Sequence, residues 1–415
     1  SNRLSNLTKG AAIHRLLGAA GCDAAAVGNA ALPRYGPQVL AEHATAARYP
    51  LLLANVRTRD GAPLAGVQLT SLFALDTIQV GIIGVTAPVD SYSAPFDLQL
   101  LPPLAIVREL AAALRQDGAD VVILLSHLGL EADRELAAGL QEDVALIVGG
   151  HSHDLLPEGE RLGRVWIVQA GAFAEHLGRV DLAWNGQHFE IERARVAAVP
   201  QETPLASAVT REVAAIEREV NRFLGDVVGE LAQPLDFATD RECGVANLMA
   251  DVLRERMGAE VAVVAAGQAF TGPLPAGPLR RVTLWDACPS PANPGVVAMA
   301  GAQFRALVAR GLDPEFAADR PAPLRGQARG LIHLSGALVR DGELLVDGQP
   351  LDPERVYRVA GSDWEFEGYG GYADPTWQLQ PRYDVPIILR ETLEVYLAAH
   401  RPVRVAMERL STLRA

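Results

Sequence analysis

Two hydrophobic patterns alternate along roughly the first 200 residues of the chain. Short segments that are apolar at every position, such as Val121–Leu125 and Val144–Val148, are typical of strands buried on both faces. Leu104–Leu114, before the first of these strands, and Glu131–Leu140, between the two, carry apolar residues three and four positions apart. This spacing predicts amphipathic helices. Buried strands that alternate with helices predict a layered α/β fold in which helices cover a sheet.

A change of pattern near residue 200 predicts a domain boundary. The segment from Val199 to Ser207 is polar and contains two prolines. A helical stripe of apolar residues then follows at Val209, Val213, Ile216, Val220 and Phe223. Beyond Asp226, helix and strand patterns are mixed again. The prediction is therefore a layered α/β domain, a connector helix and a second α/β or α+β domain, over residues 1–205, 206–225 and 226–415.

Composition and charge exclude several classes of protein. A chain of 415 residues with 49% hydrophobic and 21% charged residues can form sizeable cores, which excludes fibrous and disordered proteins. No segment reaches the roughly 18 apolar residues of a membrane span, and Ser1–Leu4 lacks the apolar core of a signal peptide. The net charge of −13 opposes binding to phosphate backbones. We therefore expect neither a nucleic-acid partner nor direct insertion into a membrane.

Histidines follow the predicted strands where those strands end. His127 follows the first of the two strands above, and His151 and His153 follow the second. Asn29 follows another short predicted strand, Asp23–Val27. Ligands of α/β proteins bind outside the carboxyl ends of strands. Taken singly, such a histidine is more often a hydrogen-bonded structural residue than a ligand. As a set of three, with the amide oxygen of Asn29, they suit Zn, Mn, Ni or Fe as well as they suit a structural role.

The motifs around these residues resemble those of a known family. Gly28-Asn29, Ser126–Gly129 and Gly149–His153 resemble three successive motifs of the calcineurin-like metallophosphoesterase domain of bacterial 5'-nucleotidases and UDP-sugar hydrolases. Segments of the second half resemble the family's C-terminal nucleotide-binding domain, in the same order: Gly244–Asp251, Val261–Gly277, Leu334–Gly336 and Asp363–Tyr372. The resemblance implies a metallophosphoesterase-like α/β sandwich followed by a 5'-nucleotidase C-terminal-like domain. It also implies a metal-dependent phosphoric ester hydrolase family that works mostly in the periplasm or cell envelope.

The first domain departs from the family at its catalytic positions. In the family, an Asp-x-His motif and a Gly-Asp motif supply ligands for two metals, and both normally precede the segment Leu4–Gly10 near which this sequence begins. The family motif Gly-Asn-His-Glu-Phe-Asp, whose His and Asp form the catalytic dyad, reads here as Gly28–Pro33. Ala30 and Pro33 therefore occupy the dyad positions, and neither side chain can transfer a proton.

The second domain departs from the family at phosphate-binding positions. Phe270 stands where the family has an arginine for the substrate phosphate, and Gly370 replaces the aspartate of the Gly-Gly-Asp-Gly-Tyr motif. Without the arginine, phosphate loses a fork-shaped donor. Substrate-binding candidates that the resemblance still implies are Asn247, Asp251, Asp363 and Trp364, the last at the family's base-stacking position.

These observations predict a catalytically impaired family member with a structural, binding or assembly role. Two divalent ions about 3.5 Å apart repel by roughly 19 kcal/mol at an effective dielectric constant of about 20. The candidate ligands Asn29, His127, His151 and His153 supply no anion, so we expect no metal or one weakly held Zn, Mn or Ni. The alternative is an active metal-dependent phosphohydrolase on nucleotides or related phosphate esters, with its first ligands upstream. A weaker alternative is a protein that holds a nucleoside at Trp364 without cleaving it.

A partner is also expected from the resemblance. Family members begin with strands that lie inside the sheet, and without those strands the neighbours carrying Val27 and Leu125 have unpaired N–H and C=O groups. We therefore expect a partner chain or a separated upstream segment to cover the incomplete N-terminal sheet.

Overall fold

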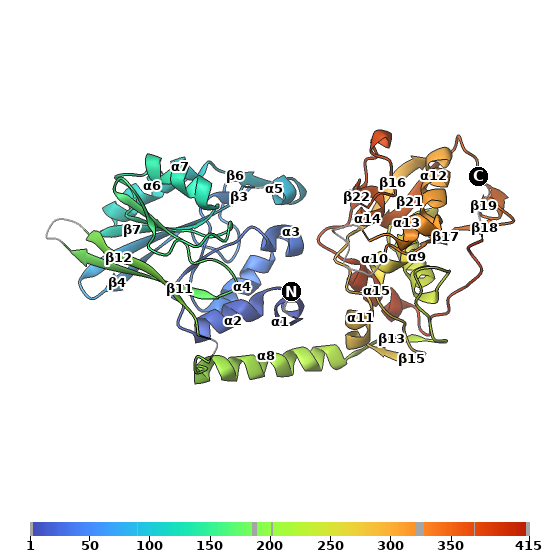
Figure 1. Ribbon diagram of the computed structural model, residues 1–415, viewed down its shortest axis with the longest axis horizontal. Helices are drawn as coiled ribbons and strands as arrows, with labels where there is room; N and C mark the ends of the chain where they lie inside the picture. The colour runs from blue at the N-terminus through green and yellow to red at the C-terminus, as the bar shows by residue number, and fades with distance from the viewer. Residues whose placement is uncertain are drawn as a thin grey trace. The chain divides into compact units, whose positions relative to one another are not determined.

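The computed structural model describes residues 3–88, 90–184, 189–200, 202–320, 328–368 and 370–411. The chain forms two compact units, Ser1–Val220 and Asn221–Ala415, called here the N-terminal and C-terminal units (Figure 1). The boundary between them falls within the long helix α8 (Ser207–Gly225). Among the described residues, no helix has the length and apolar character needed to cross a membrane.

A six-stranded sheet forms the centre of the N-terminal unit. Its strand order is β4 (Thr70–Leu75), β5 (Ile78–Thr86), β7 (Val121–His127), β8 (Leu146–Val148), β10 (Val165–Val168) and β9 (Glu160–Leu162). The four central strands are parallel, and each outer strand is antiparallel to its neighbour. The carboxyl ends of β7 and β8 therefore lie at the same edge of the sheet.

Helices cover one face of this sheet. Val122 and Leu124 of β7 point toward α6 (Pro103–Gln116) and α7 (Leu130–Gly139) and join a buried core with Ile147 and Ile167. The two helices lie over the strands in Figure 1. Because side chains alternate along a strand, residues such as Ile123 face the opposite side of the sheet.

Two separate strand pairs lie on the other face. The first pair is parallel, β1 (Ala25–Ala26) with β2 (Leu51–Leu52), and the second is the antiparallel hairpin β11 (His176–Trp184) with β12 (Phe189–Ala198). A Cβ atom added to Gly84 of β5 would lie 2.4 Å from Cβ of Leu52, so the glycine lets β2 approach the sheet closely. We call this the strand-covered face.

Short elements surround these layers in the N-terminal unit. The helices are α1 (Arg3–Leu7), α2 (Ala11–Ala19), α3 (Ala31–Tyr35), α4 (Val39–Ala47) and α5 (Asp90–Phe96). A small antiparallel pair consists of β3 (Val56–Thr58) and β6 (Leu98–Leu100). α2 packs against α4, and α3 and α4 bury a core with the β1–β2 segment that includes Leu32, Val39, Leu40, Leu51 and Leu53.

The C-terminal unit is built on a five-stranded mixed sheet. Its order is β17 (Ile332–Ser335), β14 (Val261–Ala265), β21 (Val356–Ser362), β16 (Pro294–Ala300) and β22 (Arg382–Tyr383). Only β14 and β21 are parallel. One face packs with α9 (Gly244–Arg256) and α15 (Leu389–Ala399), and the other with α12 (Gly301–Gly311). The result is a three-layered unit with a core on each side of the sheet.

Smaller elements complete this unit. The strands are β13 (Val227–Leu231), β15 (Gly277–Arg280), β18 (Ala337–Arg340), β19 (Glu343–Val346) and β20 (Gln349–Pro350). The helices are α10 (Ala266–Ala269), α11 (Arg281–Ala287), α13 (Pro314–Ala318), α14 (Asp363–Phe366) and the 3₁₀ helix η1 (Pro375–Trp377). The predicted class, layered α/β followed by a second α/β or α+β unit, is confirmed.

Candidate functional site

Three of the four predicted metal ligands meet at one edge of the N-terminal sheet. Asn29 follows β1, His127 ends β7, and His151 follows β8. The Nε2 atom of His127 lies 3.1 Å from Oδ1 of Asn29 and 3.3 Å from Nδ1 of His151. The two imidazole rings are 4.9 Å apart between centroids. The topology of the sheet thus gathers residues that are about 100 positions apart in the sequence.

Backbone geometry permits this close approach. A Cβ atom on Gly28 would lie 3.3 Å from two ring atoms of His127, which is a tight contact, so glycine leaves room for the imidazole. His151 has a φ of 77°, a left-handed conformation that side chains other than glycine adopt uncommonly. This conformation turns the chain after β8 so that the His151 ring meets His127.

The fourth candidate, His153, takes a different direction. It also has a left-handed backbone, with φ 63°, and its ring lies 6.1 Å from the ring of Phe173. Within the described part of the chain, no hydrogen bond joins His153 to Asn29, His127 or His151. His153 is therefore near the cluster without sharing its contacts.

The electrostatics of the cluster favour uncharged histidines. Burial lowers the pKa of His127, and the neighbouring His151 and His153 lower it further. A neutral imidazole is the form that binds metals. Asn29, His127 and His151 could therefore present nitrogen and amide oxygen donors to one divalent ion. Among the described residues, no three His, Cys, Asp or Glu side chains are grouped so that they could hold a metal.

Asp133 contacts the residues next to the histidine cluster. The sequence analysis did not identify it. It is completely buried on α7, and its Oδ1 accepts a hydrogen bond from the hydroxyl of Ser126, the residue before His127. A Cβ on Gly149 would lie 2.5 Å from its Oδ2, so Asp133 also packs against the end of β8. Burial raises the pKa of Asp133 to about 6. The available signal was its position on the apolar stripe of α7, three residues from Leu130 and from Leu136.

The two positions that correspond to the family dyad lie just after Asn29. Ala30 precedes α3, and Pro33 lies within it. Their side chains carry only carbon, so they offer neither a proton donor nor a metal ligand beside His127. The chemical groups available at this edge are therefore those of Asn29 and the histidines.

In the C-terminal unit, Asn247 and Asp251 bind other parts of the same chain. Asn247 is buried on α9, and its Nδ2 donates to Glu242 Oε1 at 2.6 Å and to the carbonyl of Ala406 at 3.2 Å. Asp251 accepts hydrogen bonds from both terminal nitrogens of Arg409, at 2.7 and 2.8 Å. These two candidates therefore attach the C-terminal segment to α9.

Trp364 lies in the core of the C-terminal unit. It is only 3% exposed and packs in the core on the α12 side of the sheet. The neighbouring Asp363 begins α14, and its backbone N–H donates to the carbonyl of Asn293 at 3.1 Å. The structure thus places the aromatic side chain among core residues.

The two positions that depart from the family in this unit are equally enclosed. Phe270 is fully buried in the core beside α9. Gly370 is also buried, and a Cβ there would lie 1.8 Å from the carbonyl oxygen of Trp364. That oxygen belongs to the backbone, so a larger residue at position 370 would require the loop to move. Position 270 is surrounded by apolar residues, and position 370 has no space for a side chain in this conformation.

Comparison with known proteins agrees with this architecture. Residues 227–375 match the family model described as "5'-nucleotidase, C-terminal domain". The uncharacterized metallophosphoesterase YunD of Bacillus subtilis is 25% identical over 359 residues, covering 82% of this chain and 76% of its own length. Protein UshA of Yersinia enterocolitica is 22% identical, covering 92% of this chain and 78% of its own length.

A solved structure extends the likeness to the fold of the whole chain. The NAD nucleotidase NadN of Haemophilus influenzae aligns with a TM-score of 0.54 and 16% identity, over 98% of this chain and 86% of that one. At this identity the alignment shows a shared fold. The two-unit architecture, the matched C-terminal domain and these relatives confirm the predicted family. Residues 227–375 are a 5'-nucleotidase C-terminal domain, and the chain as a whole is similar to the 5'-nucleotidase and calcineurin-like metallophosphoesterase family in its sequence and in its two-domain fold.

Proposed function

We propose that this chain is a catalytically impaired 5'-nucleotidase-family protein with a structural, binding or assembly role in the periplasm or cell envelope. The observation that carries the proposal is the enclosure of Phe270 and Gly370, which stand where the family binds phosphate and substrate. An arginine at position 270 would place a charge in an apolar core, which is costly without a partner. Ala30 and Pro33 support the same conclusion in the N-terminal unit because they cannot transfer a proton.

A single divalent ion would suit the donors that remain. Asn29, His127 and His151 would hold Zn, Mn or Ni, and such an ion would supply Lewis-acid chemistry when bound. The three donors are neutral, so they provide no charge to attract a cation or to offset a second one. We expect at most one equivalent of metal, weakly held, when the purified chain is dialysed and analysed for metals.

Hydrolase activity is the direct test of this proposal. We expect no metal-dependent release of phosphate from AMP, or of products from UDP-glucose, above the rate of an Asn29→Ala control. Each substrate should be assayed with Zn, Mn and Ni present in turn. Turnover near the ordinary enzyme median of about 10 s⁻¹ that disappears in the control would contradict the proposal.

An active metal-dependent phosphohydrolase on nucleotides or related phosphate esters is the second candidate. The contact among Asn29, His127 and His151 favours it, because three donors from separate strand ends remain in place. This function would need carboxylates from a segment upstream of Ser1 or from another chain. Adding such a segment should then restore both a second metal and turnover, and the same addition should restore neither if the chain is impaired.

We also propose that an added strand covers the N-terminal sheet. On the strand-covered face, β1–β2 and β11–β12 are separate pairs, and an apolar pocket of about 350 Å³ lies between the sheet and the hairpin. Its walls include Ile123, Leu146 and Val168 of the sheet and Val180 and Val196 of the hairpin. Unpaired strand edges beside an apolar cavity are features that strand addition removes.

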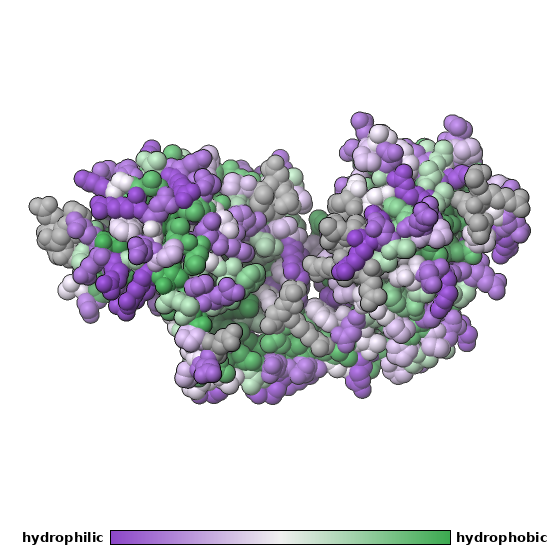
Figure 2. Space-filling view, viewed as in Figure 1, coloured by the Kyte–Doolittle hydropathy of each residue, from purple (hydrophilic) through white to green (hydrophobic). Residues whose placement is uncertain are grey.

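Exposed apolar side chains of the sheet and hairpin support this proposal. Val148, which lines the pocket, is 37% exposed, and Leu177, next to the lining residue Gly178, is 67% exposed. Figure 2 shows apolar surface on the visible face of the N-terminal unit. An extended segment with alternating apolar residues would fill the pocket and pair with the free edge of a strand. We propose that this segment comes from a partner chain or from a separated upstream part of the same polypeptide.

Native mass spectrometry of material from the source organism tests the partner proposal. A companion chain or peptide should copurify with these 415 residues. The strand that carries Leu125, β7, is paired with β5 on one side and β8 on the other, so the expectation of unpaired groups on it is wrong and the test concerns β1, which is paired with β2. Hydrogen exchange along β1 should slow when the companion is present. A stable monomer in which β1 already exchanges slowly would contradict the proposal.

A further inference from the structure

A pocket in the N-terminal unit lies apart from the histidine cluster. It encloses about 540 Å³, a volume within the usual range for small-molecule sites. Its walls come from the turn between α3 and α4, the end of β3, the following loop, and the junction of α5 with β6. None of the residues that line it belongs to the candidate metal site.

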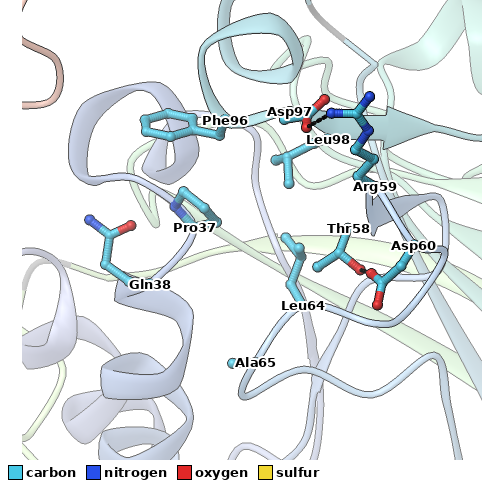
Figure 3. Close-up of a pocket in the computed structure, with 10 residues that line it drawn as sticks. All are labelled: Pro37, Gln38, Thr58, Arg59, Asp60, Leu64, Ala65, Phe96, Asp97 and Leu98. Carbon is cyan, nitrogen blue, oxygen red and sulfur yellow. Dashed lines mark hydrogen bonds and ion pairs between the residues drawn. The ribbon is translucent and has the colours of Figure 1, made fainter.

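One part of the pocket is lined by carbon. Leu64 is only 3% exposed, and Pro37, Phe96 and Leu98 are half-buried. Figure 3 shows the Phe96 ring and Pro37 on one side of the opening and the charged residues on the other. A ligand that enters this space would therefore bury an apolar group against an aromatic ring.

The charged side chains of the pocket are one arginine and two aspartates, so one negative charge is in excess. Arg59 pairs with Asp97, with Nη1 3.0 Å from Oδ2. Asp60 has no ion-pair partner among the described residues. Its Oδ1 accepts a hydrogen bond from Thr58 Oγ1 at 2.5 Å, and this bond lowers the pKa of Asp60. Since the charges of Arg59 and Asp97 compensate each other, the carboxylate of Asp60 is left with its negative charge.

Gln38 adds a second acceptor to the pocket. Its Nε2 donates to the carbonyl of Tyr35 at 2.8 Å, which leaves the amide oxygen to accept a hydrogen bond. Gln38 lies on the side of Pro37 and Phe96, opposite Asp60, so its amide oxygen would serve a separate donor of the ligand (Figure 3). A ligand that complements Asp60 must carry a hydrogen-bond donor with a positive charge.

We propose that this pocket binds an organic ammonium ion, a primary amine attached to an aromatic or aliphatic group. The ammonium group would donate to Asp60, and the carbon body of the ligand would pack against Leu64 and Leu98 and reach the Phe96 ring and Pro37 on the other side of the opening. This site is independent of the proposed loss of nucleotidase activity, because it shares no residue with the histidine cluster or with the C-terminal unit.

Binding of 4-fluorophenethylammonium to the whole chain tests the proposal. We expect saturable one-to-one binding by ¹⁹F NMR at neutral pH. Exposed ion pairs contribute up to about 1 kcal/mol, so Asp60→Asn should weaken binding by about fivefold. Phe96→Leu should weaken it by roughly threefold through loss of the aromatic contact with the ligand ring. Asp76→Asn, an acidic residue in the β4–β5 turn outside the pocket, is the matched control and should leave the affinity unchanged.

A neutral analogue separates charge recognition from simple apolar binding. The alcohol 4-fluorophenethanol has the same aromatic group without the cation, and it should bind at least about fivefold more weakly than the amine. Equal affinities for amine and alcohol would overturn the proposal. So would equal affinity of the amine for the unchanged chain and the Asp60→Asn variant, or no saturable binding, provided that thermal unfolding shows each protein to be folded.

Discussion

The two units differ in how their candidate site residues are arranged and in how completely their sheets are covered. In the N-terminal unit, Asn29, His127 and His151 meet at the sheet edge, while the second layer of strands is divided into two pairs. In the C-terminal unit, the sheet has a core on both faces, while Phe270 and Trp364 belong to those cores. The N-terminal unit thus brings candidate ligands together although its second layer consists of two separate strand pairs. The C-terminal unit has a core on both faces of its sheet, and two of its candidate site positions lie in those cores.

This contrast shows two ways in which candidate site positions depend on the surrounding fold. The histidine cluster depends on strand ends and on local backbone geometry, such as the glycine at position 28 beside the His127 ring. The positions in the C-terminal unit depend on space between elements, and apolar side chains now occupy that space. Replacing a ligand by a core residue increases apolar burial and removes a binding group at once.

The largest expected effect concerns Phe270. Phe270→Ala should destabilise the C-terminal unit by about 3–5 kcal/mol, because it removes a fully buried aromatic side chain. Denaturant unfolding followed by hydrogen exchange in each unit would measure the loss. Phe173→Ala, at a side chain 89% exposed in the N-terminal unit, is the control and should change stability by less than about 0.5 kcal/mol. An equally small effect at Phe270 would contradict the assignment of this position to the core.

A pH effect of a few kcal/mol is expected from Glu365 in the C-terminal unit. Burial raises its pKa from 4.5 to about 7, and its carboxyl accepts hydrogen bonds from the N–H groups of Ala265 and Ser362. The folded state therefore binds a proton more tightly than the unfolded state. Stability from this group is complete below pH 4.5 and is lost as the pH rises through about 7.

His333 in the same unit gives the opposite dependence. Burial lowers its pKa from 6.5 to about 4, so its contribution is complete above pH 6.5 and is lost as the pH falls toward 4. Glu365→Gln should abolish the loss of stability between pH 4.5 and about 7 and leave the loss caused by His333 toward pH 4 unchanged. Unfolding curves measured from pH 4 to pH 8 for both proteins would show the difference. A decrease in stability between pH 4.5 and 7 that is equally large in the variant would exclude Glu365 as its cause.

Position 370 should show a smaller loss of stability. Gly370→Asp restores the residue type expected from the family, but its Cβ meets the backbone oxygen of Trp364, so the variant should lose about 1–3 kcal/mol. Gly272→Asp is the matched control because a Cβ at that position has no neighbour within 4 Å. If Gly370→Asp instead gained affinity for AMP without loss of stability, the enclosure of this site would be disproved.

The smallest effects on stability are expected in the histidine cluster. His127→Ala should weaken binding of a single Zn ion by at least about tenfold, because His127 contacts both other donors, and should change the stability by less than about 1 kcal/mol. His153→Ala should weaken Zn binding less, since its ring lies beside Phe173. Equal losses from the two substitutions, measured by competition with a zinc chelator, would place His153 among the ligands.

The sequence by itself determined the elements and the ends of the strands. Continuous apolar runs predicted β7 and β8, and the residues after these runs marked the edge at which His127 and His151 meet. The stripe around Val209–Phe223 likewise lies in α8. These features depend on neighbours along the chain, so local pattern contains the information needed to predict them.

Tertiary structure decided which of the candidate residues share contacts. Asp251 binds Arg409, a partner 158 positions away, and no local pattern indicates such a pairing. The left-handed backbone of His153 sends its ring toward Phe173, and the buried Asp133 joins the ends of β7 and β8. The burial of Trp364 depends on packing against elements distant in the sequence. Contacts between distant segments depend on how whole elements pack, and this packing is absent from the periodicity of any single segment.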